Sequence, residues 1–227
     1  MSTRSSWPSR SATSQRLLPH LWSGAVGDDR WNHNIHLHRV VLDAVPPGAQ
    51  RALDVGCGEG MLSRDLHETV PEVVGLDLHE PSLDLARAQS DGDGITWVLG
   101  DVLDHPFEPA SFDVVASIAA LHHMDTVAGL EAMRDLLRPG GVLVVVGLAR
   151  TRFPRDLGWQ VAGAVSTRWL KLSPKRTYWE HSAPIVWPPP DTYAGLRAIA
   201  ERVLPGVAYR RHVLWRYSLV WTKPDLR

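Results

Sequence analysis

The stretch Ala52-Leu53-Asp54-Val55-Gly56-Cys57-Gly58-Glu59-Gly60 joins an apolar run to a turn in which every second residue is glycine. The apolar run is typical of a buried strand, and the glycines let the turn adopt unusual dihedral angles and lie against a bound molecule. The spacing is G-x-G-x-G, and Met61 occupies the position where a dinucleotide-binding turn carries its third glycine. The stretch therefore predicts a ligand-binding turn after a strand, but not a site for NAD.

The acidic residues of this turn indicate the charge of its ligand. Asp54 and Glu59 would repel the phosphates of a dinucleotide, whereas they favour a ligand with a cationic amino group and no phosphate. S-adenosylmethionine is such a ligand. We predict that five residues of the turn bind it: Asp54, Gly56, Cys57, Gly58 and Gly60.

Two further predicted strands end in acids. Val73-Val74-Gly75-Leu76-Asp77 is the second strand, and a carboxylate at its end accepts hydrogen bonds from both ribose hydroxyls of an adenosine. The third strand, Ile95-Thr96-Trp97-Val98-Leu99, leads into Asp101, which is placed to recognise an adenine amino group. Their neighbours Leu78 and Val102 are predicted to line the same site.

Two more strands follow. Phe112-Asp113-Val114-Val115-Ala116-Ser117 ends at Ser117, which we expect at the cofactor, and Leu121-His122-His123 comes next. The fifth strand, Val142-Leu143-Val144-Val145-Val146-Gly147, comes after the turn Leu137-Arg138-Pro139-Gly140-Gly141. In this order, the glycine turn, the two acids and these segments resemble a class I S-adenosylmethionine-dependent methyltransferase. The resemblance covers roughly residues 50 to 148.

The predicted fold is α/β, with a Rossmann-like, doubly wound sheet. Helical patterns at 62–69, 81–89 and 128–137 separate the strands, which favours parallel pairing with helices on both faces and a ligand above the carboxyl ends of the strands. The resemblance implies seven strands, with the last antiparallel to the rest. Residues 207–213 and 215–222 are predicted as the final pair, after a helix over 192–203.

A chain of 227 residues with 44% hydrophobic residues suits one compact domain, which we place at 27–227. Residues 1–26, rich in Ser and Arg, are predicted to be a flexible N-terminal extension. Residues 150–190 are predicted to form a cap insertion, in which one helical face covers the cofactor cleft. That face comprises Leu157, Val161, Val165, Trp169 and Leu172. Core packing is the alternative, and a membrane-surface helix is disfavoured because Arg155, Arg168 and Lys171 are few.

The histidines form two groups. His33, His36 and His38 lie before the glycine strand without neighbouring Cys, so we predict no metal site. His33 and Asn34 are expected to close over the methionine end of the cofactor, as the N-terminal segment does in related methyltransferases, while His36 and His38 pack or cap the next helix. His122 or His123 is the candidate general base for the acceptor, and the alternative is that both only shape the loop.

The composition narrows the function. The net charge of -1 disfavours nucleic acid, no run reaches the length of a membrane span, and the single Cys57 favours a reducing cytoplasm. We therefore expect methyl transfer to a small-molecule acceptor, with no nucleic acid or membrane partner and the oligomeric state left open. Ten tryptophans favour an aromatic acceptor or secondary metabolite, and the alternative for each is packing at the boundary of the core. A macromolecule methyltransferase is disfavoured by Ser117-Ile118-Ala119-Ala120, and a cyclase or decarboxylase using the same cofactor is the other alternative.

Overall fold

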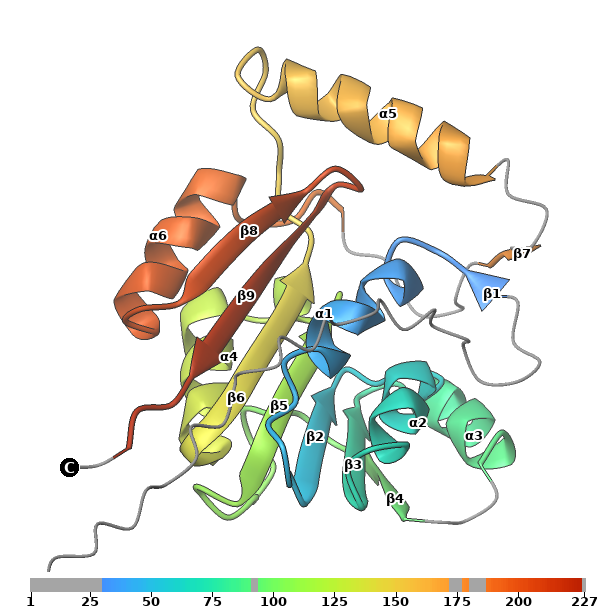
Figure 1. Ribbon diagram of the computed structural model, residues 1–227, viewed down its shortest axis with the longest axis vertical. Coiled ribbons are helices and arrows are strands. Elements are labelled where there is room, and N and C mark those ends of the chain that lie inside the picture. Colours follow the sequence, from blue (N-terminus) through green and yellow to red (C-terminus); the bar gives the residue numbers. More distant parts are fainter. Residues whose placement is uncertain (1–29, 91–93, 172–176, 180–186, 226–227) are drawn as a thin grey trace, which may run out of the picture.

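The computed structural model describes residues 30–90, 94–171, 177–179 and 187–225. Its centre is a seven-stranded sheet with the order β4-β3-β2-β5-β6-β9-β8 (Figure 1). The strands are β2 (Arg51–Val55), β3 (Glu72–Asp77), β4 (Ile95–Leu99), β5 (Phe112–Ile118), β6 (Leu137–Gly147), β8 (Ala208–His212) and β9 (Arg216–Thr222). Strands β2 to β6 pair in parallel, and β9 is antiparallel to both neighbours. The predicted Rossmann-like sheet with an antiparallel last strand is confirmed.

Helices cover both faces of the sheet, because successive residues of each buried strand point to opposite sides. Leu53, Val115 and Leu143 pack in the core with helices α4 and α6, whereas Ala52, Val114 and Val142 pack with α1 and α2. The helices are α1 (His38–Leu42), α2 (Met61–His67), α3 (Glu80–Ala88), α4 (Thr126–Leu136), α5 (Leu157–Lys171) and α6 (Tyr193–Val203). Short 3-10 turns, η1 (Ile35–Leu37) and η2 (Leu121–His123), precede α1 and α4.

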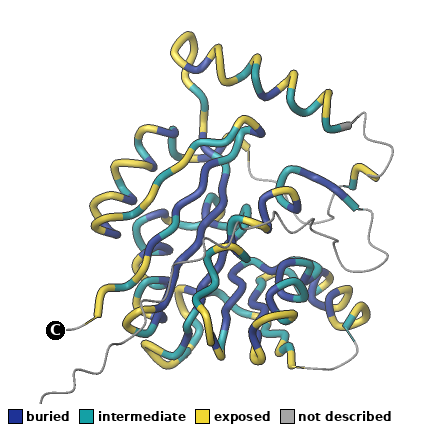
Figure 2. Tube along the Cα trace, viewed as in Figure 1, coloured by how far each residue is buried: buried dark blue, intermediate teal, exposed yellow. Residues whose placement is uncertain are grey.

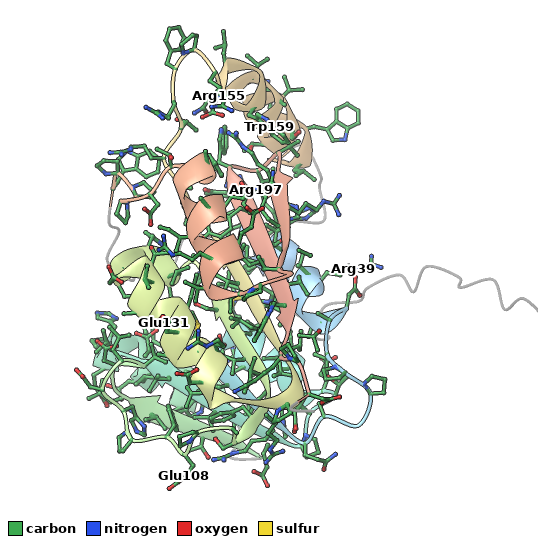
Figure 3. All side chains as sticks on the ribbon, turned by 90° about the vertical axis from the view of Figure 1, so that its left-hand side faces the viewer. Arg39, Glu108, Glu131, Arg155, Trp159 and Arg197 are labelled. Carbon is green, nitrogen blue, oxygen red and sulfur yellow. The ribbon has the colours of Figure 1, made fainter. Side chains whose placement is uncertain are left out.

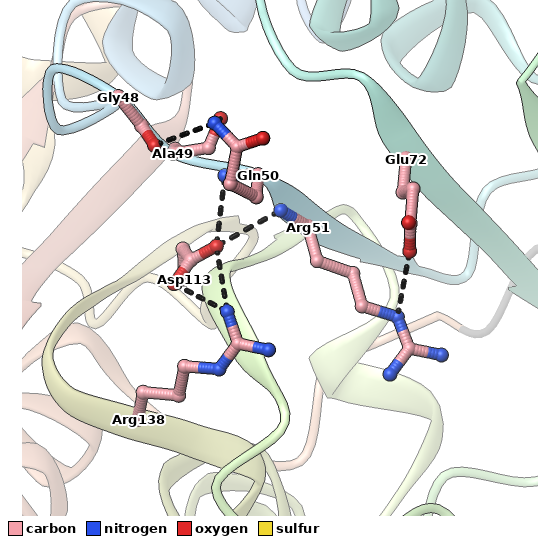
Figure 4. Close-up of polar contacts among 7 residues, drawn as sticks. All are labelled: Gly48, Ala49, Gln50, Arg51, Glu72, Asp113 and Arg138. Carbon is pink, nitrogen blue, oxygen red and sulfur yellow. Dashed lines mark hydrogen bonds and ion pairs between the residues drawn. The ribbon is translucent and has the colours of Figure 1, made fainter.

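A carboxylate joins three strands at the amino end of the sheet (Figure 4). Oδ2 of Asp113 on β5 accepts hydrogen bonds from the backbone N–H groups of Gln50 (2.8 Å) and Arg51 (2.9 Å), and Arg138 on β6 donates to Oδ1 (2.9 Å). Arg138 lies in the segment that was predicted to be a turn before the strand. In the structure this segment is part of β6 and forms an irregularity, since Phe112 pairs with Leu137 and Val114 pairs with Val142. The irregularity places the guanidinium against Asp113.

The segment after β6 differs from its prediction. Helix α5 lies at one end of the molecule, beyond the β8–β9 hairpin (Figure 1). The face predicted to cover the cofactor cleft is exposed to solvent (Figure 2); it includes Leu157, Val161, Val165 and Trp169, while Leu172 lies outside the described residues. The opposite face packs instead, because Gly163 has no side chain and admits the ring of Trp215.

The insertion, residues 150–190, also contacts the N-terminal segment through a short two-stranded sheet. Strand β1 (Arg30–Trp31) pairs in parallel with β7 (Thr177–Tyr178), and the backbone N–H of Trp179 continues this pairing with the carbonyl of Trp31. The predicted extension, 1–26, lies outside the described residues.

Candidate active site

A cleft of about 480 Å³ lies at the carboxyl ends of the parallel strands. The predicted residues among those that line it are Asn34, Asp54, Gly56, Cys57, Gly58, Asp77, Leu78, Asp101, Val102 and His123. The structure thus brings together side chains from the N-terminal segment, from the ends of three strands and from the loop after β5.

The glycine turn shows why two of its positions cannot carry a side chain. Gly56 has a φ of +74°, and a Cβ there would lie 2.2 Å from the Cβ of Ala120. Gly60 has a φ of +76°, and a Cβ there would lie 2.2 Å from the ring of Trp97. Gly60 does not line the cleft, so its role is to let the turn pack against Trp97. At Gly58 the space beside the backbone is open, which leaves room for a ligand.

Asp77 and Asp101 are held in place by backbone groups. Oδ2 of Asp77 accepts from the N–H of Gly58 (2.7 Å), and Oδ1 accepts from the N–H of His79 (2.8 Å). Each of these oxygens keeps a second lone pair for a ligand hydroxyl. Oδ1 of Asp101 accepts from the N–H of Leu103 (3.0 Å), and its carboxylate also borders the cleft.

Asp54 is the buried acid of the site. Burial raises its pKa to about 6, although the hydrogen bond from Ser63 Oγ to Oδ2 (2.7 Å) and the nearby His38 oppose the rise. Burial also raises the pKa of the Cys57 thiol above its ordinary value. Cys57 is therefore a neutral thiol and not a nucleophile at neutral pH.

The two adjacent histidines have different positions. His123 lines the cleft, whereas His122 is absent from the lining residues. Nδ1 of His122 is buried without a hydrogen-bond partner in the described part of the chain. Burial, reinforced by the charges of His123 and Arg216, lowers the pKa of His122 to about 4. His122 is therefore a weak base, and His123 is the better placed of the two candidates.

Two predicted cofactor residues are placed elsewhere. Ser117 is fully buried, and its hydroxyl donates to the carbonyl of Val55 (3.0 Å), so it joins β5 to β2 instead of facing the cleft. His33 contacts helix α5, where Nε2 lies 3.2 Å from Thr167 Oγ1, and its ring packs against Trp31 and Trp215. Asn34, the neighbour of His33, does reach the cleft.

The remaining histidines of the N-terminal group also have defined surroundings. His36 packs edge-on against Trp31, with ring centroids 6.0 Å apart. Nδ1 of His38 lies 2.7 Å from Asp65 Oδ2, and His38 lines the cleft, a role that the sequence did not indicate. Within the described ranges, no group of three or more His, Cys, Asp and Glu side chains could hold a metal ion.

Arg216 was missed by the sequence analysis. Because β9 is antiparallel and Tyr217 pairs with Gly147, the first residue of β9 lies beside the carboxyl end of β6, at the edge of the sheet that carries the cleft. Its Nε donates to Oδ1 of Asn34 (2.9 Å). Burial lowers the pKa of Arg216 to about 10, and no carboxylate pairs with it among the residues that the structure describes. The signal in the sequence that could have indicated Arg216 was the expected antiparallel direction of the last strand, which places that strand's first residue at this edge of the sheet.

Comparison with known proteins agrees with this geometry. Residues 53–145 match a family described as a methyltransferase domain. An uncharacterized methyltransferase of Mycobacterium tuberculosis is 37% identical over 198 residues, which are 87% of this chain and 99% of that one. This chain is a class I S-adenosylmethionine-dependent methyltransferase.

Two further similarities concern a named activity and a solved structure. A demethylmenaquinone methyltransferase of Roseiflexus castenholzii is 33% identical over 180 residues, which are 75% of this chain and 74% of that one. The crystal structure of an S-adenosylmethionine-dependent methyltransferase from Mesorhizobium loti has a TM-score of 0.55 at 21% identity, with 83% of this chain and 96% of that chain covered. This last likeness concerns the fold.

The residues of the cleft suit S-adenosylmethionine, the cofactor of this methyltransferase. Asp54 offers a buried carboxylate to a cationic group, and Asp77 retains acceptor capacity for two hydroxyls. The open space beside Gly58 lets a ligand approach the backbone between these two acids.

Proposed function

We propose that the methyltransferase acts on a small aromatic acceptor of the quinol type, a reduced quinone that is methylated on a ring carbon or a hydroxyl oxygen. The observation that carries this proposal is the composition of the cleft beyond the glycine turn. Ile35, Met124 and Trp179 supply apolar and aromatic surface there, and His123 supplies a titratable group. The similarity to a demethylmenaquinone methyltransferase supports the same class of acceptor.

The positions of the residues that line the cleft support a set of proposed cofactor contacts. We assign Asp77 to the ribose hydroxyls and Asp101 to the adenine amino group, with Leu78 and Val102 beside the adenine ring. Asp54 and the backbone of the glycine turn are assigned to the amino group of the methionine moiety. Asn34 borders the methionine end, where its side chain is oriented by Arg216.

The protein's part in the reaction is alignment, exclusion of water and control of one proton. S-adenosylmethionine supplies a methyl group on a sulfonium, which is already a strong electrophile. His123 accepts the proton of the acceptor hydroxyl through a ring nitrogen, so that the electron pair of the oxygen or of the conjugated ring carbon is available to the methyl group. Arg216, a partly buried cation near His122, stabilises the negative charge that develops on the acceptor.

Product analysis tests this function. The protein is incubated with S-adenosylmethionine and a short-chain naphthoquinol that lacks the ring methyl group, and the products are separated and weighed by mass spectrometry. We expect a methylated quinol together with S-adenosylhomocysteine. His123→Asn should lower turnover by roughly 10²- to 10⁴-fold, while His122→Asn is the matched control and should stay close to the parent.

Two results would contradict the proposal. Consumption of the cofactor without a methylated product would indicate a cyclase or decarboxylase reaction. Methyl transfer to a protein or nucleic acid of a cell extract, with none to quinols, would indicate a macromolecular acceptor.

A further inference from the structure

Helix α5 presents a continuous apolar stripe to solvent. Leu157, Val161 and Val165 follow one another at four-residue intervals, so they share a face, and Trp169 extends it. Their exposed fractions are 51%, 57%, 64% and 78%, and Phe153, just before the helix, is 84% exposed. Side chains of this size are rarely left in water along a whole helix face unless the face binds something.

The opposite face of α5 holds the helix in this orientation. The Oε1 atom of Gln160 accepts a hydrogen bond from Nε1 of Trp215 (2.7 Å), and Thr167 lies 3.2 Å from His33. Between them, Gly163 admits the indole of Trp215, with which any Cβ would collide at 2.6 Å. The stripe therefore points away from the molecule.

Within residues 150–171, the exposed charged side chains that the structure describes are all basic. Arg150, Arg152, Arg155 and Arg168 are exposed, and the only acid in 150–171 is Asp156. Asp156 is buried and paired with Arg211, so it does not offset these charges at the surface. Figure 3 shows Arg155 and Trp159 at the end of the molecule opposite Glu108. The net charge of the whole chain is -1, so this positive region is local.

The sequence disfavoured a membrane-surface helix and a membrane partner, but it did not show that the apolar face of α5 is exposed. On this exposure we propose that α5 docks the methyltransferase on the surface of an anionic phospholipid bilayer. The apolar stripe enters the boundary between headgroups and acyl chains, and the arginines contact the lipid phosphates. An indole such as that of Trp169 suits this boundary, because it has an apolar ring and a polar N–H group. None of the described helices is long and apolar enough to cross a membrane. The proposal is independent of the acceptor, because it concerns only this surface.

Vesicle sedimentation of the full chain tests the proposal. We expect the protein to sediment with vesicles made of equal parts phosphatidylglycerol and phosphatidylcholine, and to bind far less to phosphatidylcholine alone. The double variant Leu157→Asp with Val165→Asp should bind at least roughly tenfold more weakly, because two charges would enter the acyl boundary. Arg155→Gln with Arg168→Gln should also lose roughly tenfold, and added salt should reduce the difference from the parent.

The controls separate docking from folding. Leu85→Asp places one aspartate at an exposed apolar position of α3 and should bind vesicles like the parent. None of the substituted residues lines the cleft, so every variant should keep the parental affinity for S-adenosylhomocysteine and parental turnover of a water-soluble quinol.

Several outcomes would overturn the proposal. One is a parent protein that remains in the supernatant with anionic vesicles, and another is an aspartate double variant that binds like the parent. A parent dimer that becomes monomeric in that variant, measured by light scattering, would assign the stripe to a second copy of the chain. If the protein bound vesicles only after residues 1–26 were removed, the stripe would be assigned as a binding surface for this N-terminal segment. Each of these results leaves the proposed methylation of quinols intact.

Discussion

At the scale of single residues, the ionisation of Asp54 is predicted to be coupled to cofactor binding. Its pKa is about 6 in the free protein because the carboxylate is buried. A bound ammonium group favours the ionised form, so the complex holds fewer protons than the free protein at pH values near and below 6. Affinity for S-adenosylhomocysteine should therefore rise with pH up to about 6 and then level off.

Calorimetry over roughly pH 5 to 8 checks this pH dependence, whose limiting slope is about tenfold per pH unit. Asp54→Asn removes the titrating group, so its weaker binding should change little over the same range. An affinity of the parent protein that does not change with pH would show that Asp54 does not contact the amino group.

Arg216 is predicted to act mainly on the acceptor and only indirectly, through Asn34, on the cofactor. Arg216→Gln removes the partly buried positive charge near His122 and should lower kcat/KM for a phenolic acceptor by roughly 10- to 100-fold, the range for a hydrogen bond to a charged group. Its affinity for S-adenosylhomocysteine should fall much less, because the cofactor loses only the orientation that Arg216 gives to Asn34. Arg210→Gln, at an exposed position of β8, is the matched control. Equal losses in the two variants would argue against a specific role for Arg216.

At the scale of secondary-structure elements, Asp113 is predicted to hold β2, β5 and β6 in register. Its pKa would be raised by partial burial, but the N–H groups of Gln50 and Arg51 and the guanidinium of Arg138 together lower it below its usual value. A lowered pKa in the folded state contributes stability above the unfolded pKa of about 4, and this contribution is lost as the pH falls through the folded value.

Urea unfolding measures this contribution. Asp113→Ala should lower the free energy of unfolding by roughly 1 to 3 kcal/mol at neutral pH, because it leaves partly buried donors unpaired. The difference from the parent should shrink below about pH 4, since the parent then loses the carboxylate as well. Asp84→Ala, at an exposed position on α3, serves as the control and should have little effect. A deficit that persists unchanged in acid would mean that packing, and not the carboxylate, is responsible.

The sequence predicted the strands and helices well where a local pattern determines them. The apolar runs of β2, β3 and β5 are buried on both faces, and Pro81 lies in the first turn of α3 as expected. The pattern of α5 correctly predicted an amphipathic helix but not the direction of its apolar face. That direction depends on Gly163 and Trp215, which meet only in the folded chain.

The sequence also predicted those site residues that a local pattern determines. Gly58, Asp77 and Asp101 follow strand ends and line the cleft. Ser117 also lies near a strand end, but its hydroxyl donates to the carbonyl of Val55 in the neighbouring strand and so does not face the cleft. Arg216 could not be anticipated from its neighbours in sequence, since only the antiparallel pairing with β6 brings it beside the carboxyl end of that strand.

At the scale of the whole molecule, ligand binding should order the contact between the N-terminal segment and the insertion region, which β1 and β7 form. The β1–β7 pair has two residues per strand, and residues on either side of it, including Asn34 and Trp179, line the cleft. Small elements of this kind open easily in the absence of ligand. Hydrogen exchange should therefore slow at residues 30–37 and 177–179 when S-adenosylhomocysteine binds, with little change on the exposed face of α5. Unchanged exchange in these segments would mean that they are scaffold.

The most direct test of the account is the affinity of S-adenosylhomocysteine for the parent protein and for Asp77→Asn, measured by calorimetry. The amide retains one acceptor oxygen and removes the charge, and its loss of affinity should amount to roughly 1.5 to 3 kcal/mol. Circular dichroism should show the same fold in both proteins, and NAD should give no binding heat with either. Parental affinity in Asp77→Asn would contradict the assignment of this carboxylate to the ribose, and with it the placement of the cofactor in the cleft.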